Sequence, residues 1–511
     1  MTVLVLGDQL TRAVGPLADR TPGDRVLLIE SRALGRRLPY HPHKLVLLYS
    51  AMRHFRDELG DAGFDVEYRK VDTFEDGLDE HFDEHPGDDL VMMAPANHGA
   101  AAHLDDLVTS RGGTLEVVAN ELFLCFAEEF DDWADPDQTR FRHESFYRFV
   151  RRETGYLMDG DDPIGGEWNY DADNRETPPA GYRPPEPPVF EPDTLTREVV
   201  DWVDETFTGG YDERPFGTDW ADPEPFRWPV TRDASLRALE SFVDERLPQF
   251  GPYQDAMVAD EFAMHHSLLS ASLNLGLLHP REVVERAIRA YEADEAPLQS
   301  VEGFVRQVIG WREFVCHVYR RRMPALATAN QLGADRDLPD LYWTGETEMA
   351  CLSDVVDGVR TRGYSHHIER LMLLSNFALL YGVEPAQLDR WFRAAYVDAY
   401  DWVTTPNVVG MGVFGTDALS TKPYAASANY VDRMSDYCAN CPYDESKTTG
   451  ANACPFNALY WAFLDRNEKR LRDNHRMGLV YSHLDGKSDE ELSRIRDRAR
   501  TIRRRARDGS L

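Results

Sequence analysis

Five short apolar runs, each followed by a helical stretch, constrain the fold of the first 127 residues. The runs are rich in β-branched and other apolar residues and occupy residues 2–7, 25–30, 65–70, 90–95 and 115–120. The stretches between them, such as residues 43–63, carry apolar residues at helical spacing. Buried strands that alternate with helices form parallel sheets. The sequence therefore predicts an α/β domain with a doubly wound, Rossmann-like parallel sheet over residues 1–127.

Polar residues follow the first two runs of this domain. The segment "GDQL" (Gly7–Leu10) ends the first run, and Glu30 ends the second. Ligands of doubly wound sheets bind beyond the carboxyl ends of the strands, so these residues mark a candidate site. The sequence shows no glycine fingerprint for a dinucleotide, and the domain is therefore expected to bind another ligand or none.

The rest of the chain changes character twice. Residues 128–230 are rich in proline, acidic and aromatic residues, which predicts a long and mostly extended interdomain connection, either passive or laid over a neighbouring surface. From residue 231 to 511 almost every segment, including residues 261–278, carries apolar residues at helical spacing, which predicts one large all-helical domain. The final stretch, residues 493–511, is an arginine-rich helix, and both a solvated terminal helix and a phosphate contact are open for it.

The net charge of −33 argues, taken alone, against a nucleic-acid partner. The chain holds only six lysines against 50 arginines, however, and its acidic residues are spread over every segment. This pattern is typical of a halophilic protein that stays hydrated in molar salt. Because the Debye length is about 3 Å at 1 M salt, such a charge would repel DNA little.

No apolar stretch approaches the roughly 20 residues that cross a bilayer, and the chain opens directly on a strand-like run. We expect a cytoplasmic protein without a membrane segment. In a reducing compartment, clustered thiols bind metal more often than they form disulfides.

Three of the six cysteines lie within 17 residues, as a Cys-x2-Cys pair (Cys438 and Cys441) and a cysteine that precedes a proline (Cys454). Cys351, at a predicted helix start, is the candidate fourth ligand. A tetrahedral zinc ion and a [4Fe–4S] cluster both take four ligands, and the spacing leaves the two open.

Two adjacent histidines, His366 and His367, begin a helical segment one turn before Arg370. A histidine can give a proton to a developing oxyanion, although a lone buried histidine is more often a hydrogen-bonded core residue. Trp343 and Trp391 recur in the same domain, and either core packing or electron hopping accounts for them.

Ten segments together resemble the iron–sulfur branch of the bacterial and archaeal cryptochrome–photolyase family, which includes the prokaryotic (6-4) photolyases and photoreceptors. They follow the family's order from residue 2 to beyond residue 454 and so cover nearly the whole chain. The segments are "LVLGDQL", "YSAMRHF", "EWNYDADNRE", "GPYQDAM", "HHSLLSASLNLGLLHP", "EGFVRQVIGWREF", "YWTGETEMACL", "GYSHHIERLMLLSNFALL", "PNVVGMGVFGTDALSTKPYAASANYVDRMSDYC" and "CPY".

The resemblance implies a photolyase architecture, in which the helical domain holds FAD in a U-shaped conformation and a [4Fe–4S] cluster of structural role. The cluster ligands would be Cys351, Cys438, Cys441 and Cys454. The FAD-binding residues would be Tyr253, Ser267, Leu268, Leu269, Ser270, Gln307, Trp311, Arg312, Arg370 and Asp398, with the last pair as a salt bridge beside the flavin ring.

The implied reaction is light-driven DNA repair. Reduced FAD, excited by blue light, donates an electron to a flipped (6-4) pyrimidine–pyrimidone photoproduct, and the electron later returns. His367 would donate a proton with support from His366, and Tyr424 and Tyr430 would line the lesion pocket.

Trp391 beside FAD and Trp343 beyond it would relay electrons during photoreduction. Family members often carry a tyrosine directly after the first of these tryptophans. This chain has Phe392 there, and phenylalanine is not readily oxidised, which puts a branch through this position in doubt.

The resemblance also implies a 6,7-dimethyl-8-ribityllumazine antenna in the first domain and UV-damaged DNA as the partner. The antenna residues would be Asp8, Gln9, Leu10, Glu30 and Met52. We expect a monomer. For Asp255 in "PYQDAM" two roles are open, a ligand of a magnesium ion near the lesion phosphate and a surface capping carboxylate. Two alternatives stay open: a blue-light photoreceptor without repair activity, and a non-photochemical nucleic-acid module like the related domain of primase large subunits.

Overall fold

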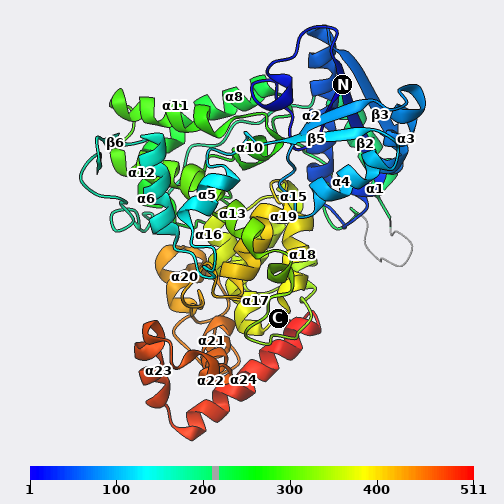
Figure 1. The fold of residues 1–511 in the computed structure, drawn as a ribbon. Helices are drawn as coiled ribbons and strands as arrows, with labels where there is room; N and C mark the ends of the chain where they lie inside the picture. The colour runs from blue at the N-terminus through cyan, green and yellow to red at the C-terminus, as the bar shows by residue number, and fades with distance from the viewer. Residues whose placement is uncertain (210–217) are drawn as a thin grey trace.

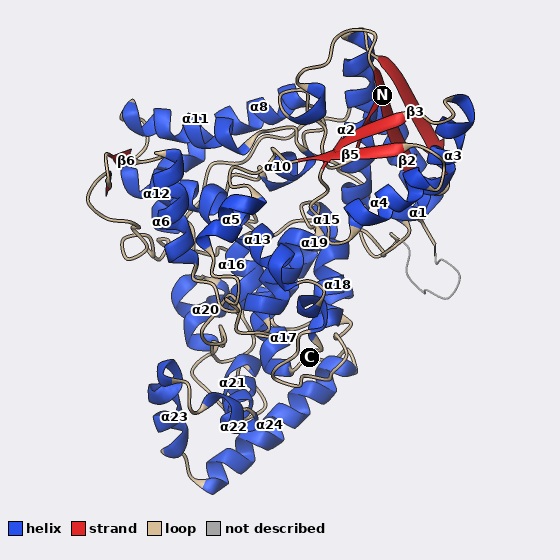
Figure 2. Cartoon of the chain, in the orientation of Figure 1, coloured by secondary structure: helices blue, strands red, loops and turns tan. Residues whose placement is uncertain are grey.

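The structure, a computed structural model, describes residues 1–209 and 218–511. The five-stranded sheet lies at one end of the molecule, and helices make up most of the remainder (Figures 1 and 2). Among the described residues, no helix is both long and apolar enough to span a bilayer.

The sheet is parallel throughout, in the order β3-β2-β1-β4-β5. Its strands are β1 (Thr2–Val5), β2 (Arg25–Ser31), β3 (Asp65–Val71), β4 (Asp89–Met93) and β5 (Thr114–Val118). All five lie where the apolar runs predicted them, and the doubly wound sheet is confirmed.

Alternate residues of β1 enter different cores, because successive side chains of a strand point to opposite faces. Val3 and Val5 pack with α2 (Pro42–Asp61) and α7 (Thr194–Phe207), whereas Leu4 packs with α3 (Phe74–Glu84) and α4 (Ala100–Thr109). Both faces of the sheet are therefore covered, which explains why β1 is apolar along its length.

The connection between the domains is less extended than predicted. It contains α5 (Ala127–Trp133), α6 (His143–Thr154), the short hairpin strands β6 (Met158–Asp159) and β7 (Asp162–Pro163), and α7; residues 210–217 lie outside the described part. The amphipathic helix α6 packs with Phe146 and Tyr147 in the core of the helical domain. Residues 164–193 are indeed without helix or strand, and contacts such as the Thr177 hydroxyl donating to the Arg433 carbonyl (3.0 Å) hold them against that domain.

Helices dominate the chain from α8 onward. These α-helices are α8 (Arg232–Ser241), α9 (Leu247–Tyr253), α10 (Ser270–Leu275), α11 (Pro280–Glu292), α12 (Leu298–Val305), α13 (Glu313–Arg322), α14 (Leu341–Thr344), α15 (Ala350–Arg362), α16 (His367–Glu369), α17 (Asn376–Tyr381), α18 (Pro385–Ala395), α19 (Asp401–Thr405), α20 (Ala428–Met434), α21 (Pro455–Arg466), α22 (Glu468–Leu471), α23 (Gly478–Asp485) and α24 (Asp489–Arg507). Two large apolar cores, one around α15, α17 and α21 and one around α11 to α13, hold these helices together.

One predicted helix is wrong in most of its length. Residues 261–269 form an irregular loop, and only Ser270–Leu275 of this stretch is helical. Asp260, Met264 and Leu268 have φ angles of 66°, 45° and 60°, a left-handed conformation that no regular helix contains. Strained backbone of this kind concentrates at functional sites, and the loop lies where sequence reasoning expected a cofactor.

Candidate functional site

The four cysteines selected from the sequence line a single cavity, although they come from separate segments. Cys351 is in the first turn of α15, Cys438 and Cys441 belong to the loop around residues 437–441, and Cys454 caps α21. Burial is the main cause that raises the pKa of Cys438 and of Cys454 to about 12, and neighbouring thiols contribute to the rise. Because a metal ligand must be a thiolate, a bound cation would have to deprotonate these two cysteines.

The spacing of the four sulfur atoms favours a group larger than one ion. A tetrahedral zinc with sulfur ligands at about 2.3 Å places the sulfur atoms about 3.8 Å apart. Among the described residues, two groups have ligand atoms that all lie within 4.8 Å of one another, and no group of cysteines is among them. The sulfur atoms are thus spread more widely than the ligands of one zinc ion, and the four thiols are a candidate site for a larger metal group.

A buried arginine that the sequence did not single out lies beside the strained loop. Arg246, at the end of η2 (Phe242–Arg246), is 1% exposed, and its Nη1 atom has no hydrogen-bond partner. Its nearest carboxylate is that of the exposed Glu245, at 3.9 Å, and burial lowers its pKa to about 10. Its Nε donates to the His266 carbonyl at 3.3 Å, next to Ser267. A buried cation with an unused donor fits an anion at this loop.

Two further arginines strengthen this positive field. Burial lowers the pKa of Arg227 and of Arg362, and the repulsion between the two guanidinium groups lowers that of Arg227 further. The charge of Arg227 in turn lowers the pKa of Arg246. Among the described residues, no carboxylate oxygen lies within 4.0 Å of Arg227 or Arg362. Asp354, Asp357, Glu369 and Asp260 lie close enough to Arg362 to oppose the fall of its pKa, so the positive charge is partly neutralised. Three clustered arginines on an acidic protein still mark a candidate site for a polyanion such as a diphosphate.

An ion pair lies at the other end of the same loop. Arg370 binds Asp398 through both carboxylate oxygens, at 3.0 and 3.1 Å, and the Ser270 hydroxyl donates to the same carboxylate at 2.7 Å. Burial would raise the pKa of Asp398, but the pair with Arg370 and the bond from Ser270 outweigh it and lower the pKa. The structure thus joins the predicted residues Ser270, Arg370 and Asp398 in one network.

The other predicted FAD residues lie on three further segments. Tyr253 ends α9 and packs on His265 with ring centroids 5.8 Å apart, while Leu268 and Leu269 belong to the strained loop. The remaining three share the π-helical segment η3 (Arg306–Arg312): Gln307 donates to the Gly303 carbonyl, Trp311 stacks on His143, and Arg312 pairs with Glu313.

A second polar network involves the predicted proton donor. His266 Nε2 lies 2.9 Å from His367 Nδ1, and His367 Nε2 lies 3.4 Å from Asp255 Oδ1. His266 Nδ1 faces the Ala263 carbonyl at 3.1 Å, so it carries the proton of that ring. Burial, together with the neighbouring histidines, holds the pKa of His266 well below its usual value and keeps the ring neutral. Its Nε2 is then an acceptor, and His367 must donate to it from Nδ1.

The partner histidine differs in character. His366 is fully buried, stacks on His266 with ring centroids 4.6 Å apart, and burial holds its pKa well below the usual value. Its Nε2 lies 3.2 Å from the Glu369 carboxyl group, but burial raises the pKa of that group to about 8, so it offers His366 little negative charge. His367 instead has a side chain that is 48% exposed, with the Asp255 carboxylate beside its outer nitrogen. The geometry therefore separates the roles of the two histidines.

One of the two predicted lesion tyrosines lies near this histidine network. Tyr430, on α20, is close enough to Asp255 for that carboxylate, after burial, to raise its pKa. Tyr424 is 38% exposed, and burial raises its pKa while Arg476 opposes the rise. Both phenols stay protonated at neutral pH and can donate hydrogen bonds.

The tryptophans form a continuous series. Trp391 is fully buried and donates to the Tyr342 carbonyl at 3.0 Å; its ring centroid lies 6.5 Å from that of Trp343, which lies 5.1 Å from that of Trp220. Phe392 instead stacks on Tyr396. Edge contacts at these distances permit electron hopping and equally serve core packing.

The predicted antenna residues gather at the carboxyl ends of β1 and β2. Burial raises the pKa of Asp8 to about 6, and its carboxylate is close enough to Tyr400 of the helical domain to raise the pKa of that phenol. Gln9 donates to the Met93 and Ala94 carbonyls. The other three residues of the set make contacts within the fold. The Leu10 amide donates to the Leu275 carbonyl, and Met52 is buried in the hydrophobic core of the first domain. The Glu30 carboxylate accepts hydrogen bonds from Arg53 and Tyr68.

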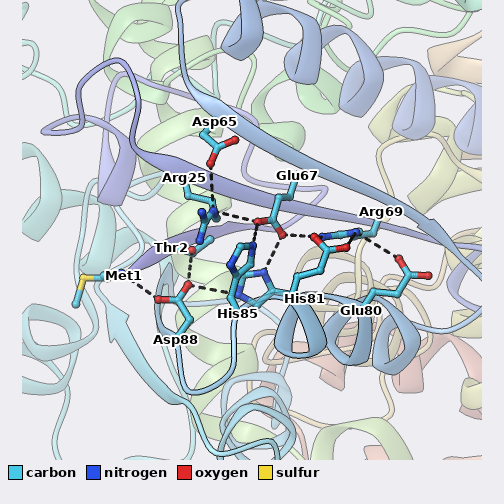
Figure 3. Close-up of polar contacts among 11 residues, drawn as sticks. Met1, Thr2, Arg25, Asp65, Glu67, Arg69, Glu80, His81, His85 and Asp88 are labelled. Carbon is cyan, nitrogen blue, oxygen red and sulfur yellow. Dashed lines mark hydrogen bonds and ion pairs between the residues drawn. The ribbon is translucent and has the colours of Figure 1, made fainter.

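One more histidine–carboxylate group lies on the first domain and is structural. Figure 3 shows Glu67 of β3 surrounded by His81, His85, Arg25 and Arg69. Its two carboxylate oxygens face four nitrogen atoms, two on each oxygen, at 2.7–3.0 Å. The lone pairs are filled and two arginines already neutralise the charge, so this group leaves no room for a metal ion.

Known proteins share this sequence and fold. Residues 3–213 match the family model described as deoxyribodipyrimidine photo-lyase-related protein. The chain is 40% identical to the (6-4) photolyase of Agrobacterium fabrum over 98% of its own length and 99% of that protein. Uncharacterized protein R855 of Acanthamoeba polyphaga mimivirus is 31% identical over 24% of the chain.

Two solved structures have a similar fold. A bacterial class III photolyase from Agrobacterium tumefaciens superposes with a TM-score of 0.57 at 18% identity, covering 85% of this chain and 86% of that one. The cryptochrome of Synechocystis sp. PCC6803 superposes with a TM-score of 0.58 at 13% identity, covering 99% and 98%. Identity of 40% over nearly the full length places the chain among the prokaryotic (6-4) photolyase relatives, and it belongs to the cryptochrome–photolyase family.

Proposed function

We propose that this protein is a (6-4) DNA photolyase, a lyase that uses blue light and reduced FAD to repair (6-4) photoproducts in UV-damaged DNA. The observation that carries this proposal is the position of His367, which lies between the neutral acceptor His266 and the carboxylate of Asp255. A photoreceptor that only signals has no need of a proton donor at the mouth of its pocket. The relationship to the Agrobacterium fabrum (6-4) photolyase supports the same substrate.

FAD fits the residues of the helical domain. The partnerless Nη1 of Arg246, beside Ser267, suits the diphosphate, and the Arg370–Asp398 pair suits a ring edge that takes up and releases charge. Bound in its reduced form, FAD supplies the light-driven electron. The chain's own contribution is to bind the anion, to orient the ring and to exclude water from the buried ion pair.

Proton transfer falls to His367. Donation from Nδ1 to His266 fixes the ring, and Asp255 stabilises a second proton on Nε2. That proton is the one available to an oxygen of a flipped lesion, and Tyr430 lies close enough to offer a further hydrogen bond. His366, held neutral by burial, stacks on His266 and supports the arrangement without donating.

The four cysteines would hold a [4Fe–4S] cluster whose role is structural, because its cavity joins α15, α21 and the loop between residues 437 and 454. The lumazine antenna between Asp8 and Met52, and a magnesium ion at the lesion phosphate, stay predictions. Charge dispersed over an acidic, lysine-poor chain supports a salt-adapted cytoplasmic protein.

The decisive test is repair in molar KCl of two oligonucleotides, one with a (6-4) photoproduct and one with a cyclobutane dimer. The protein is photoreduced beforehand, exposed to blue light with each strand, and the products are separated by chromatography. Restoration of the (6-4) strand alone is the expected result. Repair of neither strand, by protein shown to hold reduced FAD, would instead support the photoreceptor.

A further inference from the structure

The arginine-rich helix α24 has a task that the proposed repair reaction does not explain. Figure 1 shows it in red along α21 and α22, at the end of the molecule opposite the sheet. Its buried residues Ile495, Ala499, Ile502 and Ala506 recur every three to four positions and belong to the same core as Cys351 and Cys454. The helix thus packs directly onto the cysteine site.

Several arginines of α24 are committed to contacts within the protein. Arg496 pairs with Asp465 of α21 at 2.6 Å, and Arg503 donates to the Tyr381 carbonyl of α17 at 3.2 Å. Guanidinium groups that already make these contacts are not free to bind DNA phosphates. DNA contact, which the sequence left open, is therefore not the role that these two side chains favour.

Two other arginines reach the cysteine-bearing segments themselves. Arg498 Nη2 donates to the Ala451 and Ala453 carbonyls at 2.9 and 3.1 Å, immediately before Cys454. Arg505 Nη2 lies 3.2 Å from the Glu348 carboxylate, and the Glu348 carbonyl lies 4.0 Å from the sulfur of Cys441. The two arginines therefore hold the two sides of the cysteine cavity from a single rigid helix.

We infer that α24 stabilises the metal cluster by holding the cysteine-bearing segments in place, a role that we call a clasp. Arg498 is its main positioning residue. This inference rests on the proposed [4Fe–4S] cluster. The loop between Cys441 and Cys454 is largely irregular, and its backbone between Gly450 and Ala453 has few hydrogen bonds of its own: the Asn452 carbonyl accepts from Asp444, and the Ala453 amide donates to Gly450. The guanidinium of Arg498 supplies two more and keeps Cys454 facing the other three thiols.

The test compares Arg498→Gln with Arg494→Gln. Arg494 lies one turn earlier on the same helix, is exposed, and has no hydrogen bond or ion pair in the described structure, so both variants lose one positive charge. Iron and acid-labile sulfide per chain are measured after purification. The rate of iron loss to a ferrous chelator is then followed through the thiolate-to-iron absorption band.

We expect Arg498→Gln to lose iron on the order of tenfold faster than the wild type, because the loop before Cys454 loses its charge-assisted hydrogen bonds; tenfold corresponds to about 1.4 kcal/mol. Arg494→Gln should match the wild type. Arg498→Lys, which keeps the charge and one donor, should give an intermediate rate. FAD content and repair at early times should stay unchanged in all variants.

Equal iron retention in Arg498→Gln and the wild type would overturn the clasp. So would a loss of DNA affinity in Arg498→Gln with its iron intact. Wild-type protein purified without iron would overturn both the proposed cluster and the clasp. The repair assay does not measure iron, so it distinguishes that result from a failure of the proposed function. If Arg498→Gln does not fold, Arg505→Gln provides the same comparison on the other side of the cavity.

Discussion

His266 and His367 face each other through ring nitrogens 2.9 Å apart, and the two rings come from segments 101 residues apart in the chain. Because Nδ1–H of His266 donates a hydrogen bond to the Ala263 carbonyl, Nε2 of the same neutral ring can only accept a hydrogen bond from His367. The pair converts an exposed histidine into an oriented proton donor. It also places a residue outside the conspicuous His366–His367 motif in the centre of the proposed chemistry.

His266→Phe should preserve the stacking on His366 and remove the acceptor. We expect the quantum yield of (6-4) repair to fall by roughly tenfold or more, because the donor ring loses its orientation. FAD content should not change. The pH profile of repair should change as well, which a merely structural role would not produce. His483→Phe, at an exposed position, is the control, and an unaltered profile in His266→Phe would contradict the assignment.

His367→Ala should retain FAD and photoreduction but lose repair by about a hundredfold, the lower range for removal of a general acid. Repair is measured with enzyme that has been fully reduced beforehand, so that electron supply is not limiting. Repair at the wild-type quantum yield would mean that another group delivers the proton.

Arg246→Met should change cofactor binding and apoprotein stability in opposite directions. FAD affinity should fall by about tenfold to a hundredfold because the diphosphate loses a buried donor. The free energy of unfolding of the apoprotein should rise by roughly 1–3 kcal/mol, because an uncompensated buried charge is removed. Arg289→Met, an exposed site on α11, serves as control. Unchanged FAD affinity in Arg246→Met would argue that Arg246 does not contact the diphosphate.

Glu369→Gln should flatten the dependence of stability on pH. Burial raises the pKa of Glu369 to about 8, while the bond from the His366 amide and nearby cations oppose the rise. Between about pH 4.5 and pH 8, the Glu369 carboxyl group is ionised in the unfolded chain and protonated in the folded protein. The free energy of unfolding therefore falls as the pH rises through this range. The free energies of unfolding of Glu369→Gln and the wild type are measured with denaturant at pH 5 and pH 8. Relative to the wild type, the variant should be more stable at pH 8 than at pH 5. Equal differences at both values would show that Glu369 is ionised when folded.

Lesion binding should depend on salt less steeply than in the Agrobacterium fabrum relative. In the molar salt to which the acidic, lysine-poor composition points, counterion release contributes little, so insertion of the flipped lesion must supply most of the affinity. The slope of the logarithm of the binding constant against that of KCl concentration measures this directly. An equally steep slope would contradict it.

The sequence by itself determined the features that depend on local pattern. The central strands of the parallel sheet, such as Arg25–Ser31, are apolar runs because burial on both faces requires it, whereas the edge strands β3 and β5 are partly exposed and more polar. The choice of Cys351 as fourth thiol needed only a count of cysteines and a helix start, and the cavity that holds all four confirms their convergence.

Tertiary structure decided the rest. No local signal distinguishes Arg246 in "FVDERLPQF" from a charged residue on a helix surface; only the fold removes it from water and leaves its Nη1 without a partner. Residues 261–269 carry helical spacing, yet contacts from His265 to the Arg246 carbonyl and from His266 to His367 hold a left-handed, irregular backbone instead. Periodicity reports which side chains are buried, whereas the direction of a buried polar group depends on partners that are distant in sequence. For that reason the proton donor could be named from a motif, but the neutral histidine that orients it could not.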